Sequence, residues 1–163
     1  RTASQSRFSA SGGRARSAGE HPAHLAISGS SEGAAGSVLA AAGVAAVEVI
    51  EALGVPVALK PVNDLVIEGR KLGGILAETI IRDGQMSALI VGIGINLATC
   101  DRPVRPGGLE PIALDAFLPP ERVGLIDTPQ LARTLGAAVA QWCDRVADDA
   151  DVVRQAYERR TIH

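Results

Sequence analysis

Cysteines and aromatic residues are scarce in this chain of 163 residues, which has two cysteines and 2% aromatics. Cys100 and Cys143 have no metal-type spacing, so neither a disulfide framework nor a zinc site is indicated. Excess charge is also lacking, and a formal net charge of -2 argues against a general nucleic-acid binder. No apolar run approaches the roughly 20 residues of a membrane span, and Arg1 starts no signal-peptide pattern. We therefore expect a cytoplasmic protein. Small phosphorylated compounds remain candidate ligands for it.

Hydrophobic residues, by contrast, make up 47% of the chain, enough for one compact domain with a buried core. Short turns join most of the expected strands, which favours an α+β fold with a mostly antiparallel or mixed central sheet flanked by helices. Trp142 and Tyr157 are expected to be packing residues of the C-terminal helices. The patterns predict strands at 24–28, 55–60, 64–68, 70–81 and 88–95, helices at 38–53, 130–146 and 152–159, and loops at 1–19 and 29–36.

The first candidate site lies in two neighbouring segments that an expected hairpin would bring together. One contains Lys60, Asn63 and Asp64. The other contains Lys71 followed by Gly73 and Gly74, whose missing side chains would let a flat ligand approach the backbone. The pattern therefore predicts a ligand floor with a cation beside it. The alternative is a solvated turn over residues 68–71, whose charges face water.

A second candidate is the apolar run of residues 91–96, which reads V-G-I-G-I-N. Its two glycines do not make a dinucleotide fingerprint, because the third glycine is missing and a loop follows where that fold needs a helix. Asn96 at the end of the run is a candidate to donate its amide to a phosphate oxygen. It could equally cap a turn.

A third candidate is the segment of residues 7–16, where Gly12 and Gly13 stand beside Arg14 and Arg16. Backbone N–H groups and guanidinium forks both favour phosphate or carboxylate, so such a loop could fold over an anion. A basic disordered tail is the equally plausible interpretation.

Taken in order and spacing, Lys60, Asn63 and Asp64, then residues 69–78, then residues 91–96 resemble the central motifs of biotin protein ligases. The resemblance implies the fold shared with class II aminoacyl-tRNA synthetases. It implies that Lys71 is catalytic and contacts both the biotin carboxylate and the adenylate phosphate. It further implies a biotin site of Gly12, Gly13, Arg14, Lys71, Gly73 and Gly74, and an ATP site of Arg14, Arg16, Lys60, Asn63, Asp64, Lys71 and Asn96.

The function that this resemblance implies is ATP-dependent activation of biotin to biotinyl-AMP and transfer to a lysine of a biotin carboxyl carrier protein domain. Mg²⁺ would be delivered with ATP, with no dedicated metal site. A homodimer is possible, and no membrane or nucleic acid is expected as a partner of this domain. Residues 1–163 are interpreted as a single catalytic domain, truncated at both ends and lacking the family's small C-terminal barrel.

Two departures from the family keep alternatives open. Pro61 and Val62 stand where the family usually has Trp-Pro. The glycine and arginine pattern of residues 11–15 is at least as similar to the loop of lipoate ligases and octanoyl transferases, which are the first alternative. The second alternative is a non-catalytic module that binds biotin or an adenylate, since aromatic residues commonly help to form ligand pockets and few are present.

Overall fold

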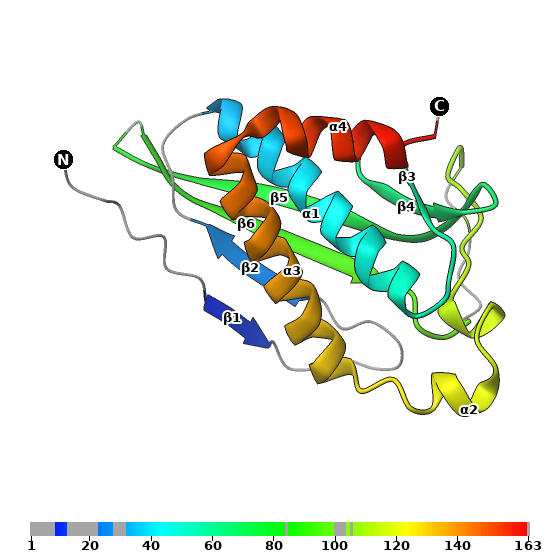
Figure 1. Cartoon of the computed structure of the whole chain (residues 1–163). Coiled ribbons are helices and arrows are strands. Elements are labelled where there is room, and N and C mark those ends of the chain that lie inside the picture. Colours follow the sequence, from blue (N-terminus) through cyan, green and yellow to red (C-terminus); the bar gives the residue numbers. More distant parts are fainter. Residues whose placement is uncertain are drawn as a thin grey trace.

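A computed structural model describes residues 9–12, 23–27, 32–83, 85–99, 104 and 106–162. Its centre is a six-stranded sheet in which every neighbouring pair is antiparallel (Figure 1). The order across the sheet is β1-β2-β6-β5-β4-β3, so the last four strands in sequence form a meander. The expected α+β architecture is thus confirmed. The strands are β1 (Ser9–Gly12), β2 (Ala23–Ile27), β3 (Ala58–Lys60), β4 (Asp64–Ile67), β5 (Arg70–Arg82) and β6 (Gln85–Ile95).

The long helices lie together on one face of this sheet (Figure 1). Helix α1 begins at Glu32, six residues before the expected start, so the loop predicted at 29–36 is wrong from residue 32 onward. Gly33 and Gly36 hid this first turn, because glycine has a poor intrinsic preference for helix. The helices are α1 (Glu32–Ala52), α2 (Pro120–Val123), α3 (Thr128–Asp148) and α4 (Ala150–Arg160), with a 3₁₀ turn, η1, at Leu114–Ala116.

The core fills the space between α1 and the sheet. Val44, Val47 and Ile50 of α1 are fully buried, and they face a layer of apolar side chains from the strands, including Val91 and Ile93 of β6. The window Ala35–Ala52 of α1 is long and apolar enough to cross a membrane by length and composition alone, and half of it is buried within the protein. Helix α1 is apolar on several sides because it packs against β5 and β6 as well as α3 and α4.

A strand lies within the segment that was expected to be loop. Strand β1 (Ser9–Gly12) pairs with β2, where Ser9 lies opposite Ala26 and Gly12 opposite Ala23. The prediction of loop throughout residues 1–19 is therefore wrong over residues 9–12. This stretch consists of serine, alanine and glycine and has no large apolar or β-branched residue, so its sequence signal for a strand is weak.

One polar network ties the three long helices together. The Glu48 carboxylate of α1 accepts a hydrogen bond from Nε1 of Trp142 on α3 at 2.8 Å and another from the Arg160 guanidinium of α4 at 2.9 Å. The guanidinium of Arg145 lies over the Trp142 ring, 4.3 Å from its centroid. Trp142 is therefore a packing residue, as expected, and its N–H also has a charged partner.

A candidate ligand-binding face on the open side of the sheet

The two faces of β6 differ sharply in side-chain size. Val91, Ile93 and Ile95 are buried beneath the helices, so Gly92 and Gly94 between them face the other way. In β5, Gly74 lies opposite Gly94 and Leu76 opposite Gly92. No helix of the described part of the chain covers this side (Figure 1). The middle of the sheet therefore presents an open floor with little side-chain bulk, which suits close approach of a ligand to the backbone.

A β-bulge brings Lys71 to this floor. Gly73 pairs with Leu65, but Lys71 pairs with Val66, so Leu72 is an extra residue in β5. Strict alternation would put Leu72 on the same face as Gly74, yet Leu72 is fully buried in the core. The bulge thus turns Leu72 inward and leaves Lys71 beside Gly74, where the Lys71 Cε would be 3.6 Å from a Cβ on Gly74. Bulges next to functional sites often re-aim a side chain in this way.

Lys71 forms an ion pair with Asp64 at the edge of the floor. The Lys71 Nζ lies 2.5 Å from Oδ1 of Asp64, whose strand is the neighbour of β5. The side chain of Lys71 is 44% exposed, and that of Asp64 is 24% exposed, so the ammonium stays accessible to a ligand while the carboxylate fixes its position. An oriented cation beside a bare backbone surface can hold an anionic group such as a carboxylate or a phosphate.

Gly73 and Gly74 lack a side chain for different reasons. A Cβ on Gly73 would lie 2.1 Å from the carbonyl oxygen of Gly94, so only glycine fits where β5 and β6 approach each other. A Cβ on Gly74 would make ordinary contacts, with the nearest atoms on Asn63, Asp64 and Lys71. Gly74 is thus the glycine that faces the site. Gly73 is required by packing within the sheet, a reason that the sequence pattern did not separate from ligand contact.

The turn between β3 and β4 is fastened to β5 by Asn63. Its side-chain amide donates to the carbonyl oxygen of Ile75 at 2.6 Å, and its own carbonyl accepts from the Ile75 N–H at 2.8 Å. Lys60, the last residue of β3, lies opposite Asp64 in register. Asp64 thus lies beside Lys71 and Asn63 lies near Gly74, whereas Lys60 is placed only by its register opposite Asp64.

Asn96 follows β6 directly. It contacts the backbone of Lys71, whereas Asp64 contacts the Lys71 side chain. Its side-chain amide donates to the carbonyl oxygens of Lys71, at 3.2 Å, and Ile112, at 3.0 Å. Both amide hydrogens are thus engaged with the backbone. A contact with a phosphate oxygen, as expected from the sequence, would require one of these bonds to be exchanged. Nothing in the sequence around Ile112 signalled its contact with Lys71.

The glycine and arginine segment is only partly placed. Gly12 is the last residue of β1 at the edge of the sheet. Gly13, Arg14 and Arg16 lie outside the described residues, so their predicted contacts with biotin and ATP stay predictions.

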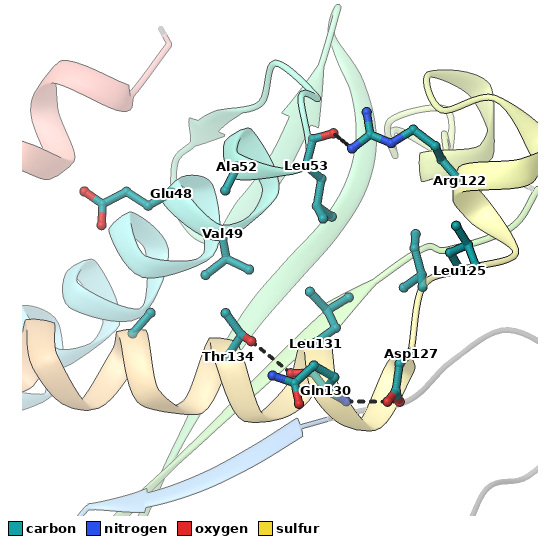
Figure 2. A pocket seen from close by; sticks show the side chains of 12 residues that line it. Glu48, Val49, Ala52, Leu53, Arg122, Leu125, Asp127, Gln130, Leu131 and Thr134 are labelled. Carbon is teal, nitrogen blue, oxygen red and sulfur yellow. Dashed lines mark hydrogen bonds between the residues drawn. The ribbon is translucent and has the colours of Figure 1, made fainter.

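A separate cavity of about 530 Å³ lies in the helical layer, away from the glycine floor (Figure 2). It is lined by the C-terminal half of α1, the start of α3 and the segment before α3. Its polar groups are largely engaged within the protein: Arg122 donates to the Leu53 carbonyl oxygen at 3.1 Å, and the Asp127 carboxylate caps α3 at the Gln130 N–H. The cavity offers mainly apolar surface and brings none of the predicted site residues together.

Comparison with known proteins gives the class. Residues 28–96, which hold the Lys60 to Asp64 turn and most of the floor, match the model of the Biotin/lipoate A/B protein ligase family. A solved biotin protein ligase-like protein of unknown function from Silicibacter sp. TM1040 has a TM-score of 0.71 at 18% identity, over 90% of this chain and 64% of its own. Aquifex aeolicus biotin protein ligase, solved with biotin and ATP, has a TM-score of 0.62 at 18% identity, over 86% of this chain and 58% of its own. The fold is that of biotin protein ligases.

One curated relative is a biotin ligase. The biotin--[acetyl-CoA-carboxylase] ligase of Paracoccus denitrificans is 33% identical in an alignment of 118 residues that covers 66% of this chain and 48% of the relative. The chain therefore spans about half the length of that relative. Residues 28–96 are thus similar to the biotin/lipoate protein ligase family, and the chain has the fold of the solved biotin protein ligases over most of its described length.

Proposed function

We propose that this chain is a catalytic domain that activates biotin with ATP and transfers it to a lysine of a biotin carboxyl carrier protein domain. The observation that carries the proposal is the ion pair of Lys71 and Asp64 at the edge of the glycine floor. The names of the Paracoccus relative and of the Aquifex complex with biotin and ATP support the choice of substrates. A cytoplasmic location and a homodimer remain predictions.

Lys71 has the central part in the first step. The biotin carboxylate attacks the α-phosphorus of ATP, a new C–O–P linkage forms, and the bond to pyrophosphate breaks. Both reactants are anionic, so an ammonium between them lowers their repulsion and stabilises the charge that develops as pyrophosphate leaves. Asp64 holds the ammonium at the edge of the floor. Gly74 keeps the surface beside it low enough for the two reacting groups to meet.

The phosphates of ATP bring a magnesium ion, which supplies further charge neutralisation. Asp64 is the carboxylate beside Lys71 on this face. Mg²⁺ usually binds through substrate phosphates together with one or two carboxylates. We propose that the ion arrives with ATP. Lys60, Arg14, Arg16 and Asn63 are proposed to lie near the nucleotide, and Gly12 and Gly13 near biotin.

In the second step the acceptor lysine, as a free amine, attacks the carbonyl carbon of the adenylate. A C–N bond forms, AMP leaves with the former carboxylate oxygen, and the amine releases a proton. The open side of the sheet gives the acceptor access, because no described helix lies over it. The product is an amide on the carrier protein.

Thermal stability with different acids tests the assignment. Biotin has a polar ureido head that needs hydrogen-bond partners, and a site built for it rejects an acid without it by as much as about 10⁴-fold. We expect biotin with ATP and Mg²⁺ to raise the melting temperature and release pyrophosphate, and octanoate with ATP to do little. The reverse order would assign the chain to the lipoate branch. Binding of biotin without pyrophosphate release would favour a non-catalytic module.

A further inference from the structure

The Asn96 carboxamide joins two segments that are far apart in sequence. It donates one hydrogen to the carbonyl oxygen of Lys71 and the other to that of Ile112. The backbone N–H of Asn96 adds a bond to the carbonyl oxygen of Leu72 at 2.8 Å. Asn96 thus contacts the backbone of both Lys71 and Leu72 at the bulge, and each of its N–H groups donates to a backbone carbonyl oxygen of the protein.

The segment around Ile112 holds the same residue from the other direction. The Lys71 N–H donates to the carbonyl oxygen of Glu110 at 2.7 Å, and the Ile112 N–H donates to the carbonyl oxygen of Lys71 at 2.9 Å. Lys71 and Pro111 form an isolated parallel bridge. The bulge interrupts the regular pairing of β5 with β4, and backbone groups left over at such a point need other partners. Residues 110–112 supply those partners, and Asn96 fastens them.

We infer that Asn96 is a positioning residue for Lys71, which acts by fixing the bulged backbone and thereby the place of the ammonium. The inference rests on the role proposed above for Lys71. It assigns to Asn96 a function through Lys71 in place of the contact with phosphate that its position after β6 suggested. Placement of a charge matters because a displacement of about 1 Å in a reacting group can cost about 10²-fold in rate.

Biotin binding without nucleotide separates these two roles, because no phosphate is then present. Asn96→Leu keeps the branched shape of asparagine and removes its hydrogen-bond donors. We expect this variant to bind biotin about ten-fold more weakly by calorimetry in the absence of ATP. An unchanged biotin affinity with a weaker ATP affinity would overturn the inference and assign Asn96 to phosphate.

A double-mutant cycle adds a readout that a general loss of stability would not move. If Asn96 acts through Lys71, Asn96→Leu should cost little further affinity once Lys71→Ala is in place. Independent, multiplying losses would contradict positioning. Thr99→Val serves as the matched control, since Thr99 fastens the same loop through Asp115 without touching Lys71. It should bind biotin as the unmodified chain does.

Amide hydrogen exchange tests the clip even if the chain proves not to bind biotin. The N–H groups of Lys71 and Ile112 should exchange at least ten-fold faster in Asn96→Leu than in the unmodified chain, while those of Val91 and Ile93 in the middle of β6 stay protected. If Asn96→Leu does not fold, the smaller Asn96→Ala takes its place. Unchanged exchange at Lys71 and Ile112 would show that Asn96 does not hold the bulge. Absence of biotin binding by the unmodified chain would instead count against the proposed function alone.

Discussion

Nζ of Lys71 and Oδ1 of Asp64 lie 2.5 Å apart, and the two residues meet because of the bulge at Leu72. Asp64 is the cross-strand neighbour of Gly74, so its carboxylate reaches the site face of the sheet. Both side chains remain partly exposed, and pairs of this kind contribute about 0–1 kcal/mol to folding. The pair therefore matters more for the orientation of the ammonium than for stability.

Lys71→Ala should lower adenylate formation by about 10²- to 10³-fold, because it removes a charge that stabilises the transition state. The melting temperature should change little, since the side chain is partly exposed and its pair is weak. Pyrophosphate release measured alongside thermal unfolding checks both parts. Arg70→Ala is a matched control, because Arg70 precedes Lys71 and, among the residues that the structure describes, pairs with the exposed Glu68. Equal turnover of Lys71→Ala and Arg70→Ala would remove Lys71 from the mechanism.

Gly73→Ala should mainly reduce stability, whereas Gly74→Ala should mainly reduce biotin binding. The Cβ at position 73 would meet the Gly94 carbonyl oxygen at 2.1 Å, so we expect a loss of about 3 kcal/mol in the free energy of unfolding. The Cβ at position 74 meets only ordinary contacts, so that variant should fold but bind biotin more weakly, since the methyl group crowds Lys71 and the floor. Urea unfolding and calorimetry measure the two effects. Similar stability of both variants would contradict this division.

Much of this fold could be predicted from local patterns. The continuous apolar run located strand β6, and the glycine turn before Arg70 located the hairpin of β4 and β5. Asp64 and Lys71 were correctly placed on neighbouring strands. The bulge could not be predicted, because it depends on the register between β4 and β5. The contact of Ile112 with Lys71 was also missed, since it joins residues 41 positions apart through backbone atoms, which leave no mark in side-chain patterns.

Glu48→Ala should destabilise the helical layer. The change leaves the Trp142 N–H and the Arg160 guanidinium without their shared acceptor, and the Arg160 side chain is 25% exposed. A lost partner of a partly buried donor typically costs about 1–3 kcal/mol, which urea unfolding would detect. Glu48→Gln keeps one oxygen acceptor and should recover part of the loss. A Glu48→Ala chain as stable as the unmodified one would show that this network contributes nothing to folding.

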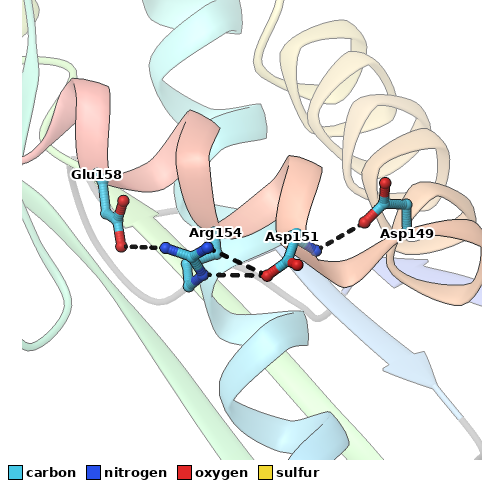
Figure 3. A network of polar contacts seen from close by, with 4 residues as sticks. All are labelled: Asp149, Asp151, Arg154 and Glu158. Carbon is cyan, nitrogen blue, oxygen red and sulfur yellow. Dashed lines mark hydrogen bonds and ion pairs between the residues drawn. The ribbon is translucent and has the colours of Figure 1, made fainter.

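The second charge network, on α4, should matter far less. The Arg154 guanidinium bonds to Asp151 and Glu158 along one exposed side of the helix (Figure 3). The hydrogen bond with Glu158, and after it the one with Asp151, raises the pKa of Arg154. Arg154 is charged at any accessible pH with or without these bonds. Solvent screens such pairs. Arg154→Ala should therefore melt within error of the unmodified chain in 150 mM salt, and a clear drop would contradict this contrast with Glu48.

Cys143 should make stability fall at high pH. Burial, and to a lesser degree the charge of Asp144, raises the pKa of the Cys143 thiol to about 11. An unfolded chain releases the same proton nearer pH 8.5, so alkaline solution favours unfolding as the pH passes from the lower value toward the higher one. Between about pH 8 and about pH 10.5 this thiol should cost the fold roughly 1–2 kcal/mol.

Cys143→Ala removes the titration, and its own loss of packing is the same at both pH values. The difference in free energy of unfolding between the two chains should therefore narrow as the pH rises. A difference that does not change with pH would mean that the Cys143 thiol ionises equally easily in the folded and unfolded chain.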